Sequence, residues 1–297
     1  MKILIAAVLA CGFADDADLV RPLEAKGVRI KKGTAGVVTQ LHLGVLKGIT
    51  IEDYRSIGQC RNLVSLGLLA EDLPFNDEAA AQLTGLDRLE KCTTNGAQLT
   101  DEGFKSLTAW KSLKHLGFDH WFRTSKDKPI GAGLALLAAL PNLESVRLGG
   151  CQVGIEAMEA LATIKTLKKL DVDHARWVDD DALLPLLKLP DLRIFIAAPQ
   201  YSPRLTDAAL RNLSGVKSLE ELTFSEIWLT YDGGFKHLAA LPKLKKLSLP
   251  KVIASEEDVK KLKAELPDLV VEWTQPDAAT IEKTKAAWLL RFEKQKK

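Results

Sequence analysis

One short phrase, an apolar residue with further apolar residues three and five positions later, repeats along most of this 297-residue chain. The step between copies is 24 residues from Leu143 to Leu167 and 30 residues from Leu113 to Leu143. Such a period means that one supersecondary unit is copied and stacked, because a single unit cannot bury its apolar face alone. The nine clearest copies begin at Val38, Leu63, Leu89, Leu113, Leu143, Leu167, Leu192, Leu219 and Leu244.

The segments between these phrases have helical character. In the segment that begins Leu205-Thr206-Asp207, a threonine that can cap a helix precedes apolar residues at helical spacing. Prolines stand two residues before several phrases and would end a helix there, since proline lacks the amide hydrogen. These prolines are Pro141, Pro190, Pro242 and Pro267. Each unit is therefore predicted to be a short strand, a loop, a helix and a return turn.

This pattern resembles the leucine-rich repeat family, in particular its ribonuclease-inhibitor-like, cysteine-containing helical variety. The segment Leu148-Gly149-Gly150-Cys151-Gln152-Val153 is similar to that variety's strand-to-helix turn, and the resemblance covers about residues 28–273. It implies an α/β fold, a right-handed solenoid with a parallel sheet on its concave face and helices on its convex face. We expect about ten repeats in residues 38–273, an N-terminal cap in 15–37, and a capping helix with a basic tail in 274–297.

The first residues resemble an export signal. Lys2 is followed by a short apolar run, and small residues at Gly12 and Ala14 flank a cleavage point before Asp15. Residues 1–14 are therefore predicted to be a signal peptide of a secreted or periplasmic protein, with lipid attachment at Cys11 as a variant. A buried N-terminal strand in a cytoplasmic protein is the alternative.

Composition excludes several classes of function. The chain has 41 basic and 39 acidic residues, so its formal charge of +2 does not favour nucleic acid or an anionic membrane as a partner. Apart from the start, no apolar run is long enough to span a bilayer. Cys92 falls at a core strand position and Cys151 at a turn position, so both are predicted to be buried, reduced thiols rather than parts of a disulfide framework.

We find no motif that specifies catalysis, a metal or a cofactor. The nearest cluster joins Asp119 and His120 after the fourth strand with Asp171, Asp173 and His174 around the sixth. Strands two repeats apart lie about 10 Å from each other, which is too far for one compact metal site. A solvated polar rim is the better interpretation, and we predict a protein that is not an enzyme.

Aligning the repeats predicts which strand residues point out of the concave sheet, since side chains alternate faces with period two. Arg147 should face Asp171, and Glu221 should more loosely face Lys246. Ile194 and Ile196 should both point outward from the seventh strand and form a small apolar spot.

Aromatic and arginine side chains gather in the loops that leave the strands, where the two longest repeats also lie. We predict that Trp121, Phe122, Arg123 and Tyr201 are exposed contact residues, because aromatic and arginine residues are enriched in interface hot spots. Trp177 and Trp228 are predicted instead to cover the edge of the core.

Three functions remain open at this point. The first is a non-catalytic scaffold that binds another protein through the concave sheet and the aromatic rim, with Arg147, Asp171, Ile194 and Ile196 as the concave contacts. The second is a glycan or cell-wall binding module in which Trp121 and Tyr201 stack on sugar rings. The third is a substrate receptor or accessory subunit of an enzyme complex.

Overall fold

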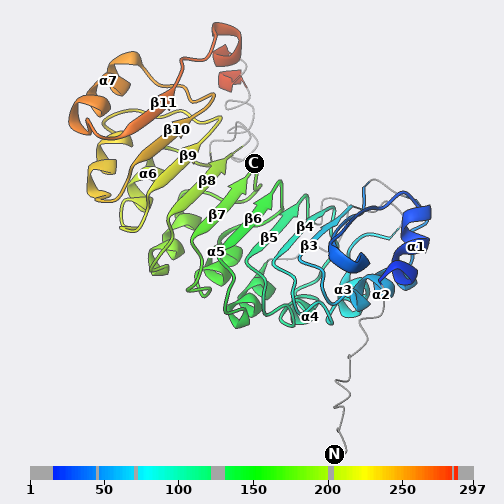
Figure 1. The fold of residues 1–297 in the computed structure, drawn as a ribbon. Helices are drawn as coiled ribbons and strands as arrows, with labels where there is room; N and C mark the ends of the chain where they lie inside the picture. The colour runs from blue at the N-terminus through cyan, green and yellow to red at the C-terminus, as the bar shows by residue number, and fades with distance from the viewer. Residues whose placement is uncertain are drawn as a thin grey trace, which may run out of the picture.

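The protein is an arch of stacked repeats, seen in a computed structural model that describes residues 16–44, 47–69, 73–121, 131–199, 204–282 and 284–286. Strands line the inner, concave side of the arch and helices line the outer, convex side (Figure 1). The strands form one eleven-stranded sheet in which each strand pairs with the next in the sequence. The predicted α/β leucine-rich-repeat solenoid is confirmed.

The sheet is parallel from β2 to β11 and continuous throughout. Its strands are β1 (Arg29–Lys32), β2 (Val38–His42), β3 (Ser65–Leu68), β4 (Lys91–Asn95), β5 (His115–Asp119), β6 (Ser145–Gly149), β7 (Lys169–Asp173), β8 (Ile194–Ala198), β9 (Glu221–Phe224), β10 (Lys246–Leu249) and β11 (Val270–Trp273). The long fourth repeat does not interrupt the ladder, because β5 and β6 pair over five residues.

The convex side carries short helices of two kinds. The α-helices are α1 (Ala17–Ala25), α2 (Ile51–Gln59), α3 (Asp77–Gln82), α4 (Phe104–Leu107), α5 (Ile155–Leu161), α6 (Asp207–Leu213) and α7 (Glu256–Glu265). The 3-10 helices are η1 (Thr34–Gly36), η2 (Ala132–Ala139), η3 (Asp181–Lys188) and η4 (Phe235–Ala240). The convex connections therefore mix α-helical with 3-10 geometry, where the sequence predicted helices of one kind.

The predicted helix ends and caps are confirmed where the sequence signals were strongest. Thr206 accepts a hydrogen bond from the Ala208 amide at 3.1 Å and caps α6. The four prolines each follow the end of their helix by two residues; for example, η2 ends at Ala139 and Pro141 follows. Proline thus marks the return from the convex side to the next strand.

Carboxylates also tie successive repeats together in a way that the sequence did not reveal. Asp207 accepts hydrogen bonds from the amide and the hydroxyl of Thr230 in the next repeat, at 2.8 and 2.7 Å. Asp180 holds Thr206 in the same manner, at 2.9 and 2.7 Å. These contacts satisfy backbone donors at the start of the helical segments and fix the stacking of neighbouring repeats.

The N-terminal edge of the sheet is closed by α1 and by β1, which pairs with β2 in the antiparallel sense. The sequence analysis expected a cap in this stretch but no strand. The sequence does contain a signal for this strand pair. Gly33 and Gly36 follow Arg29–Lys32 and precede β2, and glycines between two short strands favour a tight return.

Candidate functional site

The concave face is built from two rows of outward-facing side chains whose register matches the sequence prediction. The first row is Lys31, Gln40, Ser65, Lys91, His115, Ser145, Lys169, Ile194, Glu221, Lys246 and Val270. The second row is Arg29, His42, Gly67, Thr93, Gly117, Arg147, Asp171, Ile196, Thr223, Ser248 and Glu272. We call the part of both rows from β1 to β7 the trough.

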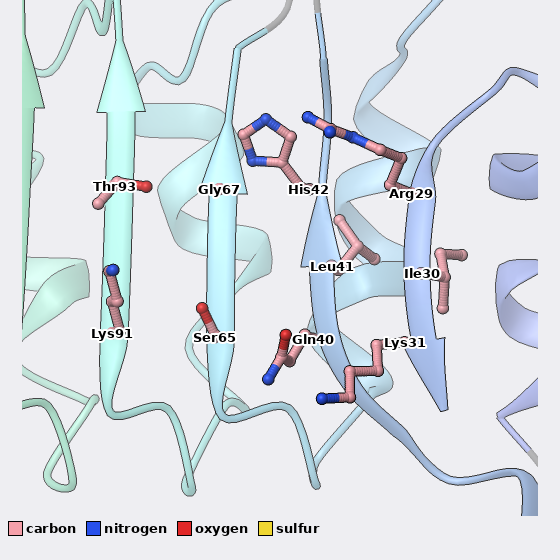
Figure 2. A pocket seen from close by; sticks show the side chains of 10 residues that line it. All are labelled: Arg29, Ile30, Lys31, Gln40, Leu41, His42, Ser65, Gly67, Lys91 and Thr93. Atoms are coloured by element: carbon pink, nitrogen blue, oxygen red, sulfur yellow. The ribbon is translucent and has the colours of Figure 1, made fainter. Parts of the chain in front are cut away.

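The trough contains two hollows that adjoin each other. The first has a volume of about 400 Å³ and lies over β1 to β4, with Arg29, Lys31 and His42 at one end (Figure 2). The second has a volume of about 230 Å³ and lies over β4 to β7. Lys91 and Thr93 line both, so the hollows form one continuous surface across seven strands.

Two glycines in the second row account for these hollows. Gly67 has no side chain, and the His42 imidazole lies over it, so a methyl group at this position would displace the ring (Figure 2). Gly117 is more open, because a methyl group there would meet Thr93 and Arg147 at 3.4 and 3.8 Å, which are ordinary contact distances. Burial and then the neighbouring Arg29 lower the pKa of His42, which favours its neutral form.

Four basic side chains of the trough lack acidic partners among the described residues. No carboxylate oxygen of the described residues lies within 4.0 Å of the charged groups of Arg29, Lys31, Lys91 or Lys169. The first three are exposed and Lys169 is half-buried. The trough therefore presents positive charge to solvent.

The residues just before the strands behave differently. There, Lys114 pairs with Glu90 at 3.0 Å and Lys168 pairs with Glu144 at 2.7 Å, both between neighbouring repeats. Further along, Lys245 pairs with Glu220 at 2.6 Å. This edge of the sheet neutralises its own charges, whereas the adjacent first row from β1 to β7 does not.

Arg147 is the centre of an acidic cluster at one side of the trough. Its guanidinium contacts Asp119 at 3.0 Å, Asp171 at 2.5 Å and Asp173 at 3.7 Å. The predicted pair of Arg147 with Asp171 is confirmed, while the two further carboxylates were not foreseen as its partners. Burial of Arg147 lowers its pKa, but the attraction of Asp171 and Asp119 outweighs burial and raises it.

The space that Arg147 occupies is available because the third outward residue of β6 is a glycine. A side chain at Gly149 would collide with both Asp119 and the guanidinium. His174 contributes a separate contact, since its Nε2 lies 3.2 Å from Glu226. Among the described residues no group of three or more histidine, cysteine or acidic side chains is arranged to hold a metal ion.

The C-terminal part of the concave face differs from the trough. Ile194 and Ile196 both face outward from β8 and are half-buried. Lys246 and Glu221 are in register as predicted, but Lys246 forms its ion pair with Glu272 at 2.8 Å, so the expected Glu221 partner is wrong. Ser248 donates a hydrogen bond to Glu272 at 2.9 Å, so Glu272 is the shared partner of Lys246 and Ser248 at this end of the face.

Trp121 is buried, which overturns its predicted exposure. Its side chain is 1% exposed, and its indole nitrogen donates a hydrogen bond to the Leu99 carbonyl at 2.9 Å. Its ring contacts Phe104 and Phe118, with centroids 5.2 and 5.5 Å away. Trp121 therefore cannot stack on a sugar ring without leaving the core.

The backbone explains this burial. His120, just before Trp121, adopts a left-handed conformation with φ 54°, as does Gly150 before Cys151 with φ 64°. In each of these repeats, the side chain that follows the left-handed residue points into the core. The residues in this inward position are Ala97, Trp121, Cys151, Ala175, Ile227 and Val252. Trp121 thus stands at the cysteine position of the repeat, a correspondence visible in the sequence that the analysis missed.

Trp177 and Trp228 are exposed, so their predicted role in covering the core is also wrong. They are 47% and 39% exposed, two or three residues beyond the left-handed turn, where the chain has moved to the surface. The Arg204 guanidinium lies 4.6 Å from the Trp177 ring centroid, and the Lys285 ammonium lies 5.8 Å from that of Trp228. Phe122, Arg123 and Tyr201 lie outside the described residues.

The thiols behave as predicted. Cys60, Cys92 and Cys151 are buried and free of disulfide bonds. Burial raises the pKa of Cys92 to about 12, and it raises that of Cys151 to about 12 against the opposing effect of nearby backbone hydrogen bonds. Such thiols stay protonated and are poor nucleophiles.

A scan against protein-family models finds no match for the chain, and a comparison with curated proteins finds none either. Among solved structures, internalin C2 of Listeria monocytogenes is 20% identical over 73% of this chain and 81% of its own, with a TM-score of 0.48. The internalin inlF of the same organism is 14% identical over 89% and 96%, with a TM-score of 0.45.

A chain of the TLR13–ssRNA13 complex is 17% identical over 81% of this chain and 37% of its own, with a TM-score of 0.52. At such identity the likeness concerns the fold alone, and it agrees with the leucine-rich-repeat solenoid described above. The ribonuclease-inhibitor-like subtype remains a prediction. Within the described residues, no helix has the length and apolar character needed to cross a membrane.

Proposed function

We propose that this protein is a non-catalytic scaffold that binds another protein through its concave sheet. The observation that carries the proposal is the continuous trough over β1 to β7, where two adjoining hollows of about 400 and 230 Å³ are floored by Gly67 and Gly117. Concave surfaces with a few convergent polar groups are the usual sites of binding. The likeness to a solved leucine-rich-repeat structure supports the solenoid fold that carries this trough.

The described part of the chain supports a binding role more than chemistry. His42 and His115 belong to the trough, and no carboxylate of the described residues lies within ion-pairing distance of either ring. The three thiols are buried and protonated. The polar groups of the trough are instead spread over seven strands, which suits contact with an extended partner.

Blocking the floor of the trough tests this function. Gly117→Trp places a large ring over the second hollow, and Ala239→Trp places the same ring on exposed convex surface as the matched control. Immobilised wild type and both variants are used to capture proteins from the native source, followed by mass spectrometry. We expect proteins that bind wild type and Ala239→Trp to be lost with Gly117→Trp. Proteins that bind all three equally, or no specific capture at all, would contradict the proposal.

Secretion is a further part of the proposal. It rests on the signal-like residues 1–14, which lie outside the described residues. Mass measurement of the protein made in its own cells checks it, with loss of the first fourteen residues as the expected result. A lipid-modified Cys11 would instead show as an added mass on a chain that begins at that cysteine, and an intact Met1 would contradict export through this signal.

A further inference from the structure

The first row of the trough carries lysines at regular intervals. Lys31 lies on β1, Lys91 on β4 and Lys169 on β7, so one lysine occurs every third strand. Neighbouring strands are separated by about 4.8 Å, which puts successive lysines about 14 Å apart along the trough. An extended peptide rises about 3.3 Å per residue, so about four residues span that interval.

These lysines face no acidic group of the trough itself. Of the residues in the two rows from β1 to β7, all of which the structure describes, Asp171 is the sole carboxylate. Arg147 holds that carboxylate at 2.5 Å. None of the lysines' neighbours in the first row of the trough is acidic; they are Gln40, Ser65, His115 and Ser145.

The contrast with the adjacent edge shows that this lack of partners is not general along the sheet. One residue earlier in the chain, Lys168 reaches Glu144, whereas Lys169 has no such partner in the part of the chain that the structure describes. In the same row on β10, Lys246 reaches Glu272. Cations that the fold leaves unpaired over a hollow surface attract a partner of opposite charge and orient it on approach.

We propose that the trough binds an extended acidic segment of a partner protein, with its carboxylates on Lys31, Lys91 and Lys169 and its backbone over Gly67 and Gly117. Arg29 adds a fourth cation at the β1 end (Figure 2). This inference rests on the proposed scaffold function and specifies the chemistry of its partner. The segment crosses the strands rather than extending the sheet, because the trough runs from strand to strand.

A nucleic acid fits this surface less well. Asp119 and Asp173 flank Arg147 beside Asp171, so three carboxylates surround one guanidinium where a continuous phosphate chain would pass. No tryptophan, tyrosine or phenylalanine belongs to the two rows of the trough, so bases have no ring on which to stack. A peptide meets neither obstacle, since it can place its acidic residues only where lysines lie.

The test uses a fluorescent peptide of about 16 residues with glutamate at every fourth position of a glycine–serine chain, matched to the strand spacing. Its control has glutamine at the same positions. Affinity of the full chain is measured by fluorescence anisotropy at low salt, and zero-length carbodiimide coupling followed by mass spectrometry locates the lysines that join the peptide. We expect the glutamate peptide to bind more tightly than the control and to couple at Lys31, Lys91 and Lys169.

Charge reversal supplies the matched variants. Lys91→Glu should weaken binding of the glutamate peptide by about 3- to 10-fold, and reversal of all three lysines by about 30-fold or more, since each exposed pair contributes modestly. Lys246→Glu, in the same row but outside the trough, should change it less than about 2-fold. Thermal unfolding of each variant checks that these substitutions leave the fold intact.

Several results would overturn the inference. They are equal binding of the two peptides, coupling spread over lysines outside the trough, an equal loss with Lys246→Glu, or tighter binding of a single-stranded oligonucleotide. Its failure can be told apart from failure of the scaffold function. One informative result is a captured protein that no longer binds Gly117→Trp but still binds the variant with all three lysines reversed. This result would support the scaffold function and contradict binding of an acidic segment.

Discussion

The concave face of the sheet and the loops that leave its strands lie next to each other in the repeats, yet different rules place their side chains. On the trough, the two-residue alternation of a strand decides which side chains face the concave side, and the predicted rows are in register from strand to strand. In the loops, one left-handed residue after the strand decides, so Trp121 points inward while Trp177 and Trp228 point outward.

This difference teaches that residue type is a poor guide to contact residues in a solenoid loop. Tryptophan is enriched at interfaces because it combines a large apolar area with a hydrogen-bond donor, but the same properties suit a buried site with a free carbonyl. Trp110 and Trp121 both donate to carbonyls of the preceding repeat, at 2.8 and 2.9 Å. Position relative to the left-handed residue separates the two uses.

Truncation of the tryptophans in the loops tests the difference between inward and outward positions most strongly. Trp121→Ala should lower the free energy of unfolding by about 3 to 5 kcal/mol, because it opens a cavity beside Phe104 and Phe118 and leaves the Leu99 carbonyl unpaired. Trp177→Ala should cost less than about 1 kcal/mol, since that side chain is 47% exposed and fills no core position. Denaturant unfolding measures both, and equal costs would contradict the assignment of inward and outward positions.

Thiol labelling sharpens the contrast between the two faces of one strand. Cys92 is buried under the trough, whereas Thr93 faces into it. Under native conditions we expect Thr93→Cys to react with a thiol reagent at least about 100-fold faster than Cys92, which only the unfolded chain exposes. Rapid labelling of Cys92 in the wild-type protein would show that the core is open.

The same thiols predict a pH dependence. Burial raises the pKa of Cys92 from 9.0 to about 12, so the folded state keeps a proton that the unfolded chain loses above pH 9.0. The contribution of this thiol to stability is complete below pH 9.0 and is lost as the pH rises toward about 12. A Cys92→Ala variant, whose pH profile is flatter in this window than that of wild type, checks the assignment.

Replacement of Arg147 tests the cluster that this residue forms with Asp119, Asp171 and Asp173. Arg147→Met should destabilise the fold by about 1 to 2 kcal/mol, because Asp119, Asp171 and Asp173 then repel one another without a shared cation. Lys246→Met, which removes the cation of a single exposed pair, should cost less than about 0.5 kcal/mol. Urea unfolding at low and high salt provides the measurement, and added salt should recover part of the Arg147→Met loss.

The smallest expected effects concern the glycines of the floor. Gly117→Ala should change stability by less than about 0.5 kcal/mol because its methyl group meets only ordinary contacts. Gly67→Ala should cost about 1 kcal/mol because His42 must move. Moving the ring into solvent should also raise the lowered pKa of His42 toward 6.5, which an NMR titration measures. An unchanged His42 pKa in Gly67→Ala would contradict the contact.

The sequence alone determined the solenoid and the register of its concave face. The period of 24 to 30 residues requires stacked units, and the alternation within each phrase fixes which residues point outward. The pairing of Arg147 with Asp171 follows from these two patterns. The burial of Cys92 and the helix ends before the prolines follow from equally local rules.

Only the tertiary structure decided which partners the long and bulky side chains contact. Arg147 reaches two further carboxylates because Gly149 leaves room, Lys246 selects Glu272 over Glu221, and Trp121 fills the position that a cysteine occupies one repeat later. These choices depend on the space and partners that neighbouring repeats offer in three dimensions. The period in the sequence determines which position of the repeat each residue occupies. Side-chain packing between repeats determines where the functional atoms of that residue lie.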